Sequence, residues 1–480
     1  MPVCTGRCGD REKVRRQEIN TTERDVAMAD TRDFGQGSVA KNILSMAIPM
    51  TIAQMVNVLY NVVDRFFIGH VPGASSLALT GVGIVFPIIS IITAFTNLFG
   101  MGGAPLCSIA WGRQEHERAE EIIGTAFFML VTTSLVLTAV GMVFMRPLLY
   151  LFGASTETYV YAQDYFSFYI CGSPFAMIGL GMNGFINSQG FGTVGMMTIA
   201  IGALINIILD PIFIFALQLG VRGAAIATVF SQLISAVWVL RFLTGKKAIL
   251  KLRRQNIRWN ASILKRVVQL GLSHFVMSFT NAITQFAYNT TLQSFGGDVY
   301  VGAMTVINSV REVVTMPVNG IASGAQPVLG YNYGAQKYDR VKKGIIFMTL
   351  VCLIYMLLAW GVVFRFPAQL MGIFNNNAEL IGIGAQMMHI YFFGFCFMAF
   401  QMSGQSAFTS LGYAKYAIFF SLFRKVMVVL PLIFILPRFM GVDGILWSEP
   451  ISNLVGGLFC FTTMMFTIWR KLPHKASSSR

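Results

Sequence analysis

Long apolar segments recur along the chain between Ile43 and Trp469, and short polar breaks separate them. A helix needs about 20 apolar residues to cross the hydrocarbon core of a bilayer. Twelve segments reach this length, near residues 44–70, 79–104, 119–145, 157–187, 191–217, 221–243, 264–294, 301–330, 343–366, 380–410, 413–437 and 443–469. They are too long for the short alternating strands of a transmembrane barrel. The pattern therefore predicts an all-α membrane protein with twelve spanning helices.

The composition agrees with this prediction and excludes a soluble protein of the same size. Hydrophobic residues make up 55% of the 480 residues and charged residues only 12%, and the mean hydropathy is +0.63. The net charge of +15 could by itself indicate nucleic-acid binding. Where the basic residues lie along the chain decides between these interpretations.

Most basic residues fall in alternate loops, as expected if cytoplasmic loops are enriched in Lys and Arg. The loop between the sixth and seventh helices and two further loops on the same side carry Lys246, Lys247, Lys251, Arg253, Arg254, Arg258, Lys265, Arg266, Arg113, Arg118, Lys337, Arg340, Lys342 and Lys343. The opposite loops hold little more than Arg146, Arg222, Arg365 and Arg438. We therefore expect no nucleic-acid partner, and we place both termini and the middle loop in the cytoplasm.

The two polar ends of the chain are expected to be cytoplasmic tails, at residues 1–42 and 471–480. The first contains no apolar segment of the kind found in a signal peptide. Cys4 and Cys8 in this tail lack a nearby His or Cys partner, so we expect no metal site there. The other five cysteines lie in or beside apolar helices, where Cys commonly behaves as a small hydrophobic residue.

The two halves of the chain resemble each other. With a shift of 222 residues, Asn97, Gly102, Pro105, Gly112, Gln114 and Arg118 match Asn319, Gly324, Pro327, Gly334, Gln336 and Arg340. With a shift of 221, eight positions between Leu209 and Ser231 match positions between Leu430 and Ser452. Each half has six predicted helices, so the halves are parallel repeats.

This repeat predicts the domain organisation. We expect an N-lobe at 43–245, a basic cytoplasmic linker at 246–262 that serves as the hinge, and a C-lobe at 263–470. Two six-helix bundles around a central cavity form the architecture of an alternating-access secondary transporter.

Two carboxylates interrupt apolar helices of the N-lobe, Asp64 in the first and Asp210 in the fifth. A carboxylate at bilayer depth is costly, and such residues usually serve ions, protons or charged substrates. In the repeat, Pro431 stands opposite Asp210, and the seventh helix carries no carboxylate. The pair of acids therefore belongs to the N-lobe alone.

Two polar side chains are expected to join these acids. Asn206 precedes Asp210 by four residues and so shares its helix face, and Thr228 lies at a comparable depth on the sixth helix. Pro211 lacks an amide hydrogen and should bend the fifth helix. Burial and a neighbouring carboxylate both disfavour the ionised form, so this cluster is suited to bind a proton or a sodium ion. The alternative is that each Asp only bonds a local donor and fixes helix packing.

The C-lobe also carries charges in apolar segments, at Glu449, Arg311 and Glu312. They could contact a charged group of a substrate, or they could pair with Arg424 or Lys425 and hold helices together. We expect the pairing, because it is the common fate of charges inside a membrane.

The chain resembles the multidrug and toxic compound extrusion (MATE) transporters over essentially all of 42–470. The matching motifs are Tyr60-Asn-Val-Val-Asp64 followed by Phe-Ile-Gly69, Asn183-Gly, Gln189-Gly190, Asn206-Ile-Ile-Leu-Asp210-Pro, Gly220-Val-x-Gly-Ala-Ala225 and Gln326-Pro-Val-Leu-Gly-Tyr-Asn332-Tyr-Gly-Ala335. The resemblance implies twelve helices in two bundles, a V-shaped cavity and cation-driven antiport of bulky, amphipathic, often cationic compounds.

Within the family, the chain looks like the DinF-like branch. Carried over residue by residue, the resemblance implies an ion-coupling site at Asp64, Asn206, Asp210 and Thr228, and substrate binding by Tyr60, Asn57, Asn183 and the two acids. The NorM-like branch carries its characteristic acids on the seventh and tenth helices, and both helices lack them here.

Two other functions remain open. A lipid-linked oligosaccharide flippase of the same superfamily would need several basic residues around its cavity to bind pyrophosphate, and only Arg311, Arg424 and Lys425 are available. A membrane enzyme would need a clustered catalytic set, yet the five His residues are dispersed and no HExxH, nucleophile-elbow or Walker A motif occurs.

The sequence as a whole therefore predicts a multidrug efflux antiporter rather than an enzyme. We expect no cofactor and no metal, with Na⁺ as the alternative to H⁺ at Asp64 and Asp210. The expected partners are small-molecule drugs or metabolites, H⁺ or Na⁺, and the lipid bilayer. We expect a monomer in the plasma membrane.

Overall fold

The computed structural model describes residues 33–71, 75–373 and 378–473. Cys4, Cys8 and most of the predicted N-terminal tail therefore lie outside the described residues, as does the end of the C-terminal tail. All regular elements within the described ranges are helices. The short ones are α5 (Met145–Leu151), η2 (Arg254–Asn256), α12 (Pro367–Gly372) and α17 (Pro437–Met440).

Twelve long helical segments correspond one to one with the predicted spans. In the first half they are α2 (Val39–Ile68), α3 (Ser75–Gly112), α4 (His116–Val143), α6 (Thr156–Ser188), α7 (Gly192–Pro211) with η1 (Ile212–Ala216), and α8 (Gly220–Thr244). In the second half they are α9 (Ala261–Gly296), α10 (Asp298–Gly334), α11 (Tyr338–Arg365), α13 (Ala378–Tyr391) with η3 (Phe395–Phe397) and α14 (Met398–Ser410), α15 (Ala414–Leu422) with η4 (Phe423–Val429) and α16 (Leu430–Ile435), and α18 (Val442–Met464) with η5 (Met465–Trp469).

Most of these segments are apolar enough to cross a membrane. Within the described residues, nine helices pass by length and hydropathy, and the pair Ala378–Tyr391 and Phe395–Ser410, bent by 50°, makes a tenth span. The two remaining segments, α9 and α10, are the longest after α3, at 36 and 37 residues. Polar side chains of α10, among them Glu312, Ser323 and Gln326, line interior cavities described below rather than facing lipid.

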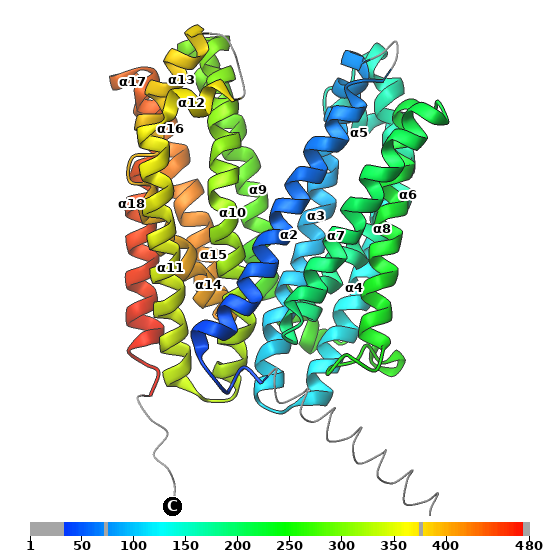
Figure 1. Ribbon diagram of the computed structural model, residues 1–480, viewed down its shortest axis with the longest axis vertical. Coiled ribbons are helices and arrows are strands. Elements are labelled where there is room, and N and C mark those ends of the chain that lie inside the picture. Colours follow the sequence, from blue (N-terminus) through cyan, green and yellow to red (C-terminus); the bar gives the residue numbers. More distant parts are fainter. Residues whose placement is uncertain (1–32, 72–74, 374–377, 474–480) are drawn as a thin grey trace, which may run out of the picture.

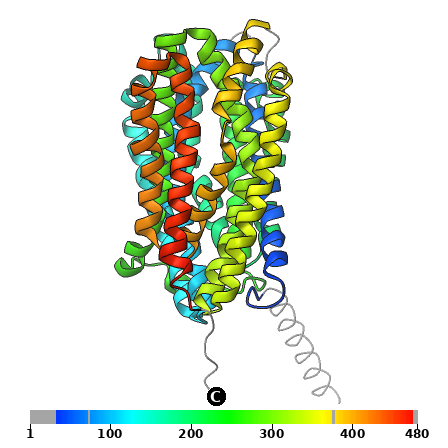
Figure 2. The ribbon, with the colours of Figure 1, turned by 90° about the vertical axis from the view of Figure 1, so that its left-hand side faces the viewer.

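The helices form two bundles (Figure 1). Helices α2 to α8 pack in one bundle, in which α6 contacts α3 and α8, and α9 to α18 pack in the other, in which α14 contacts α18. The bundles lie close together at the end that carries the loop after α8 and diverge toward the opposite end (Figure 1). We call the first the basic end, because the Lys- and Arg-rich loops gather there. The view at 90° shows α11 and α18 on the outer side of the second bundle (Figure 2).

Glycines allow the bundles to meet at the basic end. The backbone of Gly112 in α3 lies against the carbonyl of Tyr331 in α10, and Gly334 in α10 lies against the carbonyl of Ile109 in α3. The 222-residue shift of the repeat relates Gly112 to Gly334 and Ile109 to Tyr331. The two contacts are therefore equivalent, and the repeat makes the interface symmetric. Farther along α3, Gly102 meets the backbone of α9 at Gly271. Any side chain at these positions would push the helices apart.

The chain that precedes α2 covers this meeting point. Phe34 packs edge-on against Trp111 of α3 and Tyr331 of α10, with ring centroids 6.0 Å from each. The guanidinium of Arg340 donates to the carbonyls of Phe34 at 2.9 Å and Gln36 at 2.7 Å. These contacts fasten the start of the described chain across both bundles.

The basic linker is attached to the first bundle. The backbone N–H of Leu250 donates to Gln189 Oε1 at 2.8 Å, and that of Lys251 donates to Glu120 Oε1 at 3.1 Å. Glu120 also pairs with Arg253 at 2.6 Å. Beyond the linker, Asn260 caps α9 by accepting from the first backbone N–H groups of that helix. If the lobes move relative to each other, this part of the linker moves with the N-lobe.

Candidate functional site

The two predicted acids are both placed in the interior of the first bundle. Asp64 lies one turn before the end of α2 and is 5% exposed, and Asp210 lies in the last turn of α7 and is fully buried. The missing N–H of Pro211 interrupts the helical hydrogen bonds, and the chain continues as the π-helical turn η1. A π-helical turn therefore follows Pro211, directly beside the second acid.

The four residues predicted for ion coupling form one contiguous cluster. The carboxyl groups of Asp64 and Asp210 lie within hydrogen-bonding reach of each other. The amide of Asn206 donates to Asp210 Oδ1 at 3.1 Å and to Thr228 Oγ1 at 3.4 Å. Three helices, α2, α7 and α8, thus bring together side chains that lie up to 164 positions apart in the sequence.

Three acceptor atoms of this cluster are unpaired. Asp64 Oδ1, Asp210 Oδ2 and Asn206 Oδ1 are buried acceptor atoms without a hydrogen-bond partner among the described residues. Buried polar atoms are rarely left unpaired, and each such case requires an explanation. Two carboxylates in contact repel each other when both are ionised. A shared proton or a small cation would remove both the repulsion and the unpaired acceptors.

Tyrosines surround the cluster, and two of them were missed in the sequence analysis. The hydroxyls of Tyr60 and Tyr165 both lie within hydrogen-bonding reach of Thr228. Tyr169 stacks on Tyr165 with ring centroids 6.0 Å apart and lies within hydrogen-bonding reach of Gln232 of α8. Tyr165 and Tyr169 stand four residues apart on α6, and this spacing was a signal that two aromatic hydroxyls share one buried face.

A central cavity lies between the two bundles and touches the cluster. Asp64 and Tyr60 line it from α2, and Glu312 and Met316 line it from α10, around a volume of about 370 Å³. This volume lies at the low end of the range for small-molecule pockets, about 300–1,000 Å³. Asp210 is fully buried behind Asp64 and does not line this cavity.

Arg65 lines the same cavity beside Asp64. This was not expected, because Arg65 stands about 100° farther around the helix than Asp64. Its guanidinium lies over the ring of Phe86, 4.7 Å from the centroid. This stacking holds the charged group against α3.

A second cavity of about 310 Å³ lies within the first bundle. Three residues predicted to contact substrate, Asn57, Tyr60 and Asn183, all line it, and Tyr60 lines the central cavity as well. Asn183 donates to the carbonyl of Gly195 at 3.2 Å and so stands apart from the carboxyl cluster. The predicted substrate residues therefore border two neighbouring cavities that share Tyr60.

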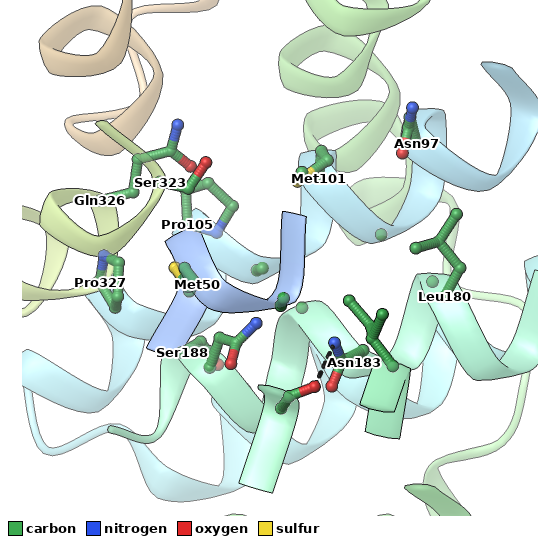
Figure 3. Close-up of a pocket in the computed structure, with 18 of the residues that line it drawn as sticks. Met50, Asn97, Met101, Pro105, Leu180, Asn183, Ser188, Ser323, Gln326 and Pro327 are labelled. Atoms are coloured by element: carbon green, nitrogen blue, oxygen red, sulfur yellow. Dashed lines mark hydrogen bonds between the residues drawn. The ribbon is translucent and has the colours of Figure 1, made fainter. Parts of the chain in front are cut away.

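A third cavity, of about 130 Å³, lies closer to the basic end (Figure 3). Asn183 and Met101 line it from the first bundle, and Ser323 and Gln326 line it from α10. The close-up shows Met50 of α2 between these two walls (Figure 3). Flexible methionines suit a pocket that accepts ligands of different shape.

In the C-lobe, the predicted pairing is confirmed for Glu449, whereas Glu312 lines the central cavity instead. Arg424 Nη1 lies 3.0 Å from Glu449 Oε1, and Lys425 Nζ lies 3.4 Å from Glu449 Oε2. All three side chains are buried between η4 and α18. No group of three or more His, Cys, Asp or Glu side chains that could hold a metal ion occurs among the residues that the structure covers.

Comparisons with known proteins agree with this architecture. The family model described as MatE matches residues 49–212 and 274–435. The multidrug export protein MepA of Staphylococcus saprophyticus is 23% identical over 88% of this chain and 93% of its own. MepA of Staphylococcus haemolyticus is 21% identical over 91% of this chain and 94% of its own.

Solved structures resemble the whole molecule. A crystal structure of MATE in the bent conformation has a TM-score of 0.86 and 22% identity, and covers 91% of this chain and 97% of that one. A multidrug resistance MATE family transporter in an outward-facing conformation has a TM-score of 0.85 and 21% identity, and covers 91% and 98%. These likenesses confirm the predicted twelve-helix fold. Together with the family match over both halves, they establish that this chain belongs to the MATE family.

Proposed function

We propose that this protein is a secondary multidrug efflux antiporter that exports amphipathic, often cationic compounds in exchange for H⁺ or Na⁺. Membership of the MATE family and the likeness to proteins named multidrug export protein MepA support efflux. We further propose that it is a monomer in the plasma membrane with its basic end and both termini in the cytoplasm, where Lys- and Arg-rich loops are enriched. In that orientation, the divergence of the bundles at the other end corresponds to an outward-facing arrangement.

The observation that carries the coupling mechanism is the pair of unpartnered carboxyl oxygens on Asp64 and Asp210. In the proposed cycle, a proton or Na⁺ binds between these groups, assisted by Asn206 and Thr228. Binding removes a buried negative charge, and this change favours one arrangement of the lobes over the other. Release of the cation restores the charge and favours the return.

Asp64 would connect ion binding to substrate binding. It contacts Asp210 within the cluster, and it also lines the central cavity. A cationic substrate in that cavity and the coupling cation therefore compete for the same carboxylate. Tyr60, Asn57 and Asn183 would contact the rest of the substrate, whereas Asp210, fully buried, would act on the coupling cation only.

The flippase alternative is disfavoured by the charge of the central cavity. Its charged lining includes Asp64 and Arg65 from the N-lobe and Glu312 from the C-lobe. This set is negative on balance, so it would repel the pyrophosphate of a lipid-linked sugar. The same two acids attract an organic cation. The arrangement thus supports drug export over the flipping of an anionic lipid.

Transport by the purified protein in liposomes tests this proposal. Uptake of the fluorescent cation rhodamine 123 would be followed under a pH gradient alone and under a Na⁺ gradient alone. We expect uphill transport by the wild-type protein under one gradient, and its loss in Asp64→Asn and in Asp210→Asn. Asp164→Asn is the matched control, because Asp164 lies outside the cluster. Its carboxylate pairs with Arg222 at a distance of 2.9 Å. Full uphill transport by both cluster variants would refute the coupling site.

A further inference from the structure

A groove at the basic end has walls from both lobes and encloses about 340 Å³. Arg113 and Arg118 line it from the N-lobe, and Arg266, near the start of α9, lines it from the C-lobe. Glu115 is the one acidic residue that the structure places in this lining, and apolar side chains such as Ile122 complete the walls. We call this space the basic groove. It offers positive charge beside apolar surface.

The positive charge of the basic groove is not balanced by the protein. Within the described ranges, Arg113 and Arg266 form no ion pair, and Arg118 pairs only with Glu115, at 3.3 Å. Three arginines against one carboxylate leave a surplus of two positive charges. A cleft lined by charges of one sign attracts ions of the opposite sign. The groove therefore favours an anion.

The repeat relates the basic groove to a site that the protein itself fills. Residues 33–38, which precede α2 and which we call the entry segment, occupy that site. Six residues that contact the entry segment correspond, at a shift of 222 residues, to six that line the groove. The pairs are Trp111 and Tyr333, Gly190 and Gly412, Tyr331 and Ile109, Asn332 and Ala110, Lys337 and Glu115, and Arg340 and Arg118. The two sites are therefore equivalent positions at the interface of the lobes.

The filled site shows which chemistry this position binds. The four backbone carbonyls of residues 34–37 accept hydrogen bonds from Arg340 and Lys337 at distances between 2.7 and 3.0 Å. The carboxylate of Asp33 adds a negative charge that interacts with Arg340, and the ring of Phe34 is buried between aromatic side chains. The site thus binds a row of oxygen acceptors and a negative charge beside an apolar group.

The chain does not fill the basic groove in the same way. The same shift relates the entry segment to residues 256–260, which precede α9. These residues lie against α4 instead, where the carbonyl of Asn256 packs on Gly124 and Arg258 pairs with Glu121 at 3.3 Å. The groove therefore keeps its arginines accessible to a ligand from outside the chain.

We infer that the basic groove binds a phosphate group that carries an apolar chain, supplied by an anionic phospholipid of the adjacent leaflet. The phosphate oxygens accept from Arg118, as the carbonyls of the entry segment accept from the equivalent arginine. Arg113 and Arg266 stand where the filled site has Ala335 and Leu44, and they meet the full negative charge of the phosphate. Basic pockets between transmembrane helices at the cytoplasmic side bind lipid headgroups of this kind.

This lipid holds the two lobes together at the basic end. The groove is lined by α3 and α4 of the N-lobe and by α9 of the C-lobe, so it is complete only in the arrangement in which the lobes meet there. A ligand that binds one arrangement more tightly shifts the equilibrium toward it. An anionic phospholipid therefore promotes closure of the basic end, independently of any transported drug.

Lipid binding to the purified protein would be measured by native mass spectrometry, with palmitoyl-oleoyl phosphatidylglycerol and the matching phosphatidylcholine. We expect the wild-type protein to bind phosphatidylglycerol more tightly. The double variant Arg113→Gln, Arg266→Gln should weaken this binding about 10- to 100-fold, the usual effect of losing charge-assisted hydrogen bonds. The double variant Arg241→Gln, Arg254→Gln is the control, because it removes the same charge from two exposed residues that do not line the groove.

A soluble competitor separates a lipid from a free phosphate compound. Glycerol 3-phosphate carries the phosphate of the headgroup without acyl chains, so we expect it not to displace phosphatidylglycerol. Displacement that is lost in the Arg113→Gln, Arg266→Gln variant would retain the anion site and assign it to a soluble phosphate compound instead of a lipid.

The effect on the lobes would be measured with spin labels at the exposed positions Thr244 in α8 and Lys343 in α11, in a cysteine-free background. The protein would be placed in nanodiscs of phosphatidylcholine with and without phosphatidylglycerol. We expect phosphatidylglycerol to increase the population with the shorter distance in the wild-type protein and in the control variant, and to have no effect in the Arg113→Gln, Arg266→Gln variant.

Each contrary result has a defined meaning. Equal affinity of the wild-type protein for the two lipids would overturn the site, and this comparison needs no variant to fold. Equal weakening in the two double variants would show that only the overall charge of the basic end attracts the lipid, and would also overturn it. Lipid binding that leaves the distances unchanged would overturn the role in closure. None of these measurements involves a drug or an ion gradient, so their failure leaves the export proposal untouched.

Discussion

Replacement of Gly102 by alanine is expected to open the basic end of the protein. The added methyl group would meet the carbonyl of Val267 and the backbone of Gly271 on α9, where there is no flexible side chain to move aside. Overpacking of this kind costs about 1–3 kcal/mol. Alanine also favours a helix over glycine by about 1 kcal/mol, but that gain is present in both lobe arrangements and so cancels.

The overpacking cost therefore falls on the arrangement in which the lobes meet at the basic end. A difference of 1–3 kcal/mol shifts a two-state equilibrium by about 5- to 150-fold. Spin labels at the exposed positions Thr244 in α8 and Lys415 in α15 would report the separation of the lobes at this end, in a cysteine-free background. We expect Gly102→Ala to increase the population with the longer distance.

A control on the same helix makes the test specific. Gly83 in α3 is exposed, and a methyl group there would meet no atom within 4 Å, so Gly83→Ala should leave the distance distribution unchanged. If Gly102→Ala also leaves it unchanged, the close backbone contact between α3 and α9 does not hold the basic end closed, and this reasoning is wrong.

Two further predictions concern contacts that hold the lobes and the C-lobe core. Phe34→Ala removes a buried ring between Trp111 and Tyr331. It should increase the population with the longer distance in the spin-label measurement. An unchanged distance distribution would show that Phe34 packs there without holding the lobes together. Glu449→Gln leaves buried cations without their carboxylate and should lower the free energy of unfolding by about 3–5 kcal/mol. Glu115→Gln breaks only an exposed pair with Arg118 and should lower it by about 0–1 kcal/mol. Equal melting temperatures for these two variants would contradict the assigned burial of the C-lobe charges.

Much of the fold follows from the sequence because the bilayer imposes one simple requirement. Each span must be apolar over a fixed length, so all twelve helices could be located, including α9 and α10 despite their polar faces. The repeat then paired the two halves. The local sequence pattern does not predict where helices cross. The contact of Gly112 with Tyr331 and the packing of Phe34 at this contact could therefore be seen only in the structure.

Some residues of the candidate site could likewise be predicted from the sequence, and others could not. Asn206 and Asp210 are neighbours on one helix face, and Thr228 could be placed at a comparable depth on the sixth helix. Tyr165 was missed because a tyrosine in an apolar helix is most often an ordinary packing residue. The linker was expected to serve as a hinge, but its bonds to Gln189 and Glu120 depend on a chain reversal that no local pattern encodes.

Proton release on substrate binding tests the central claim most directly. Rhodamine 123 would be added to the purified protein in weakly buffered solution, and the released protons would be counted with a pH indicator. If Asp64 and Asp210 share a proton that an organic cation displaces, the wild-type protein releases about one proton per bound dye, and Asp64→Asn and Asp210→Asn release none. Unchanged release from both variants, or dye binding by the wild-type protein that liberates neither a proton nor Na⁺, would contradict the account.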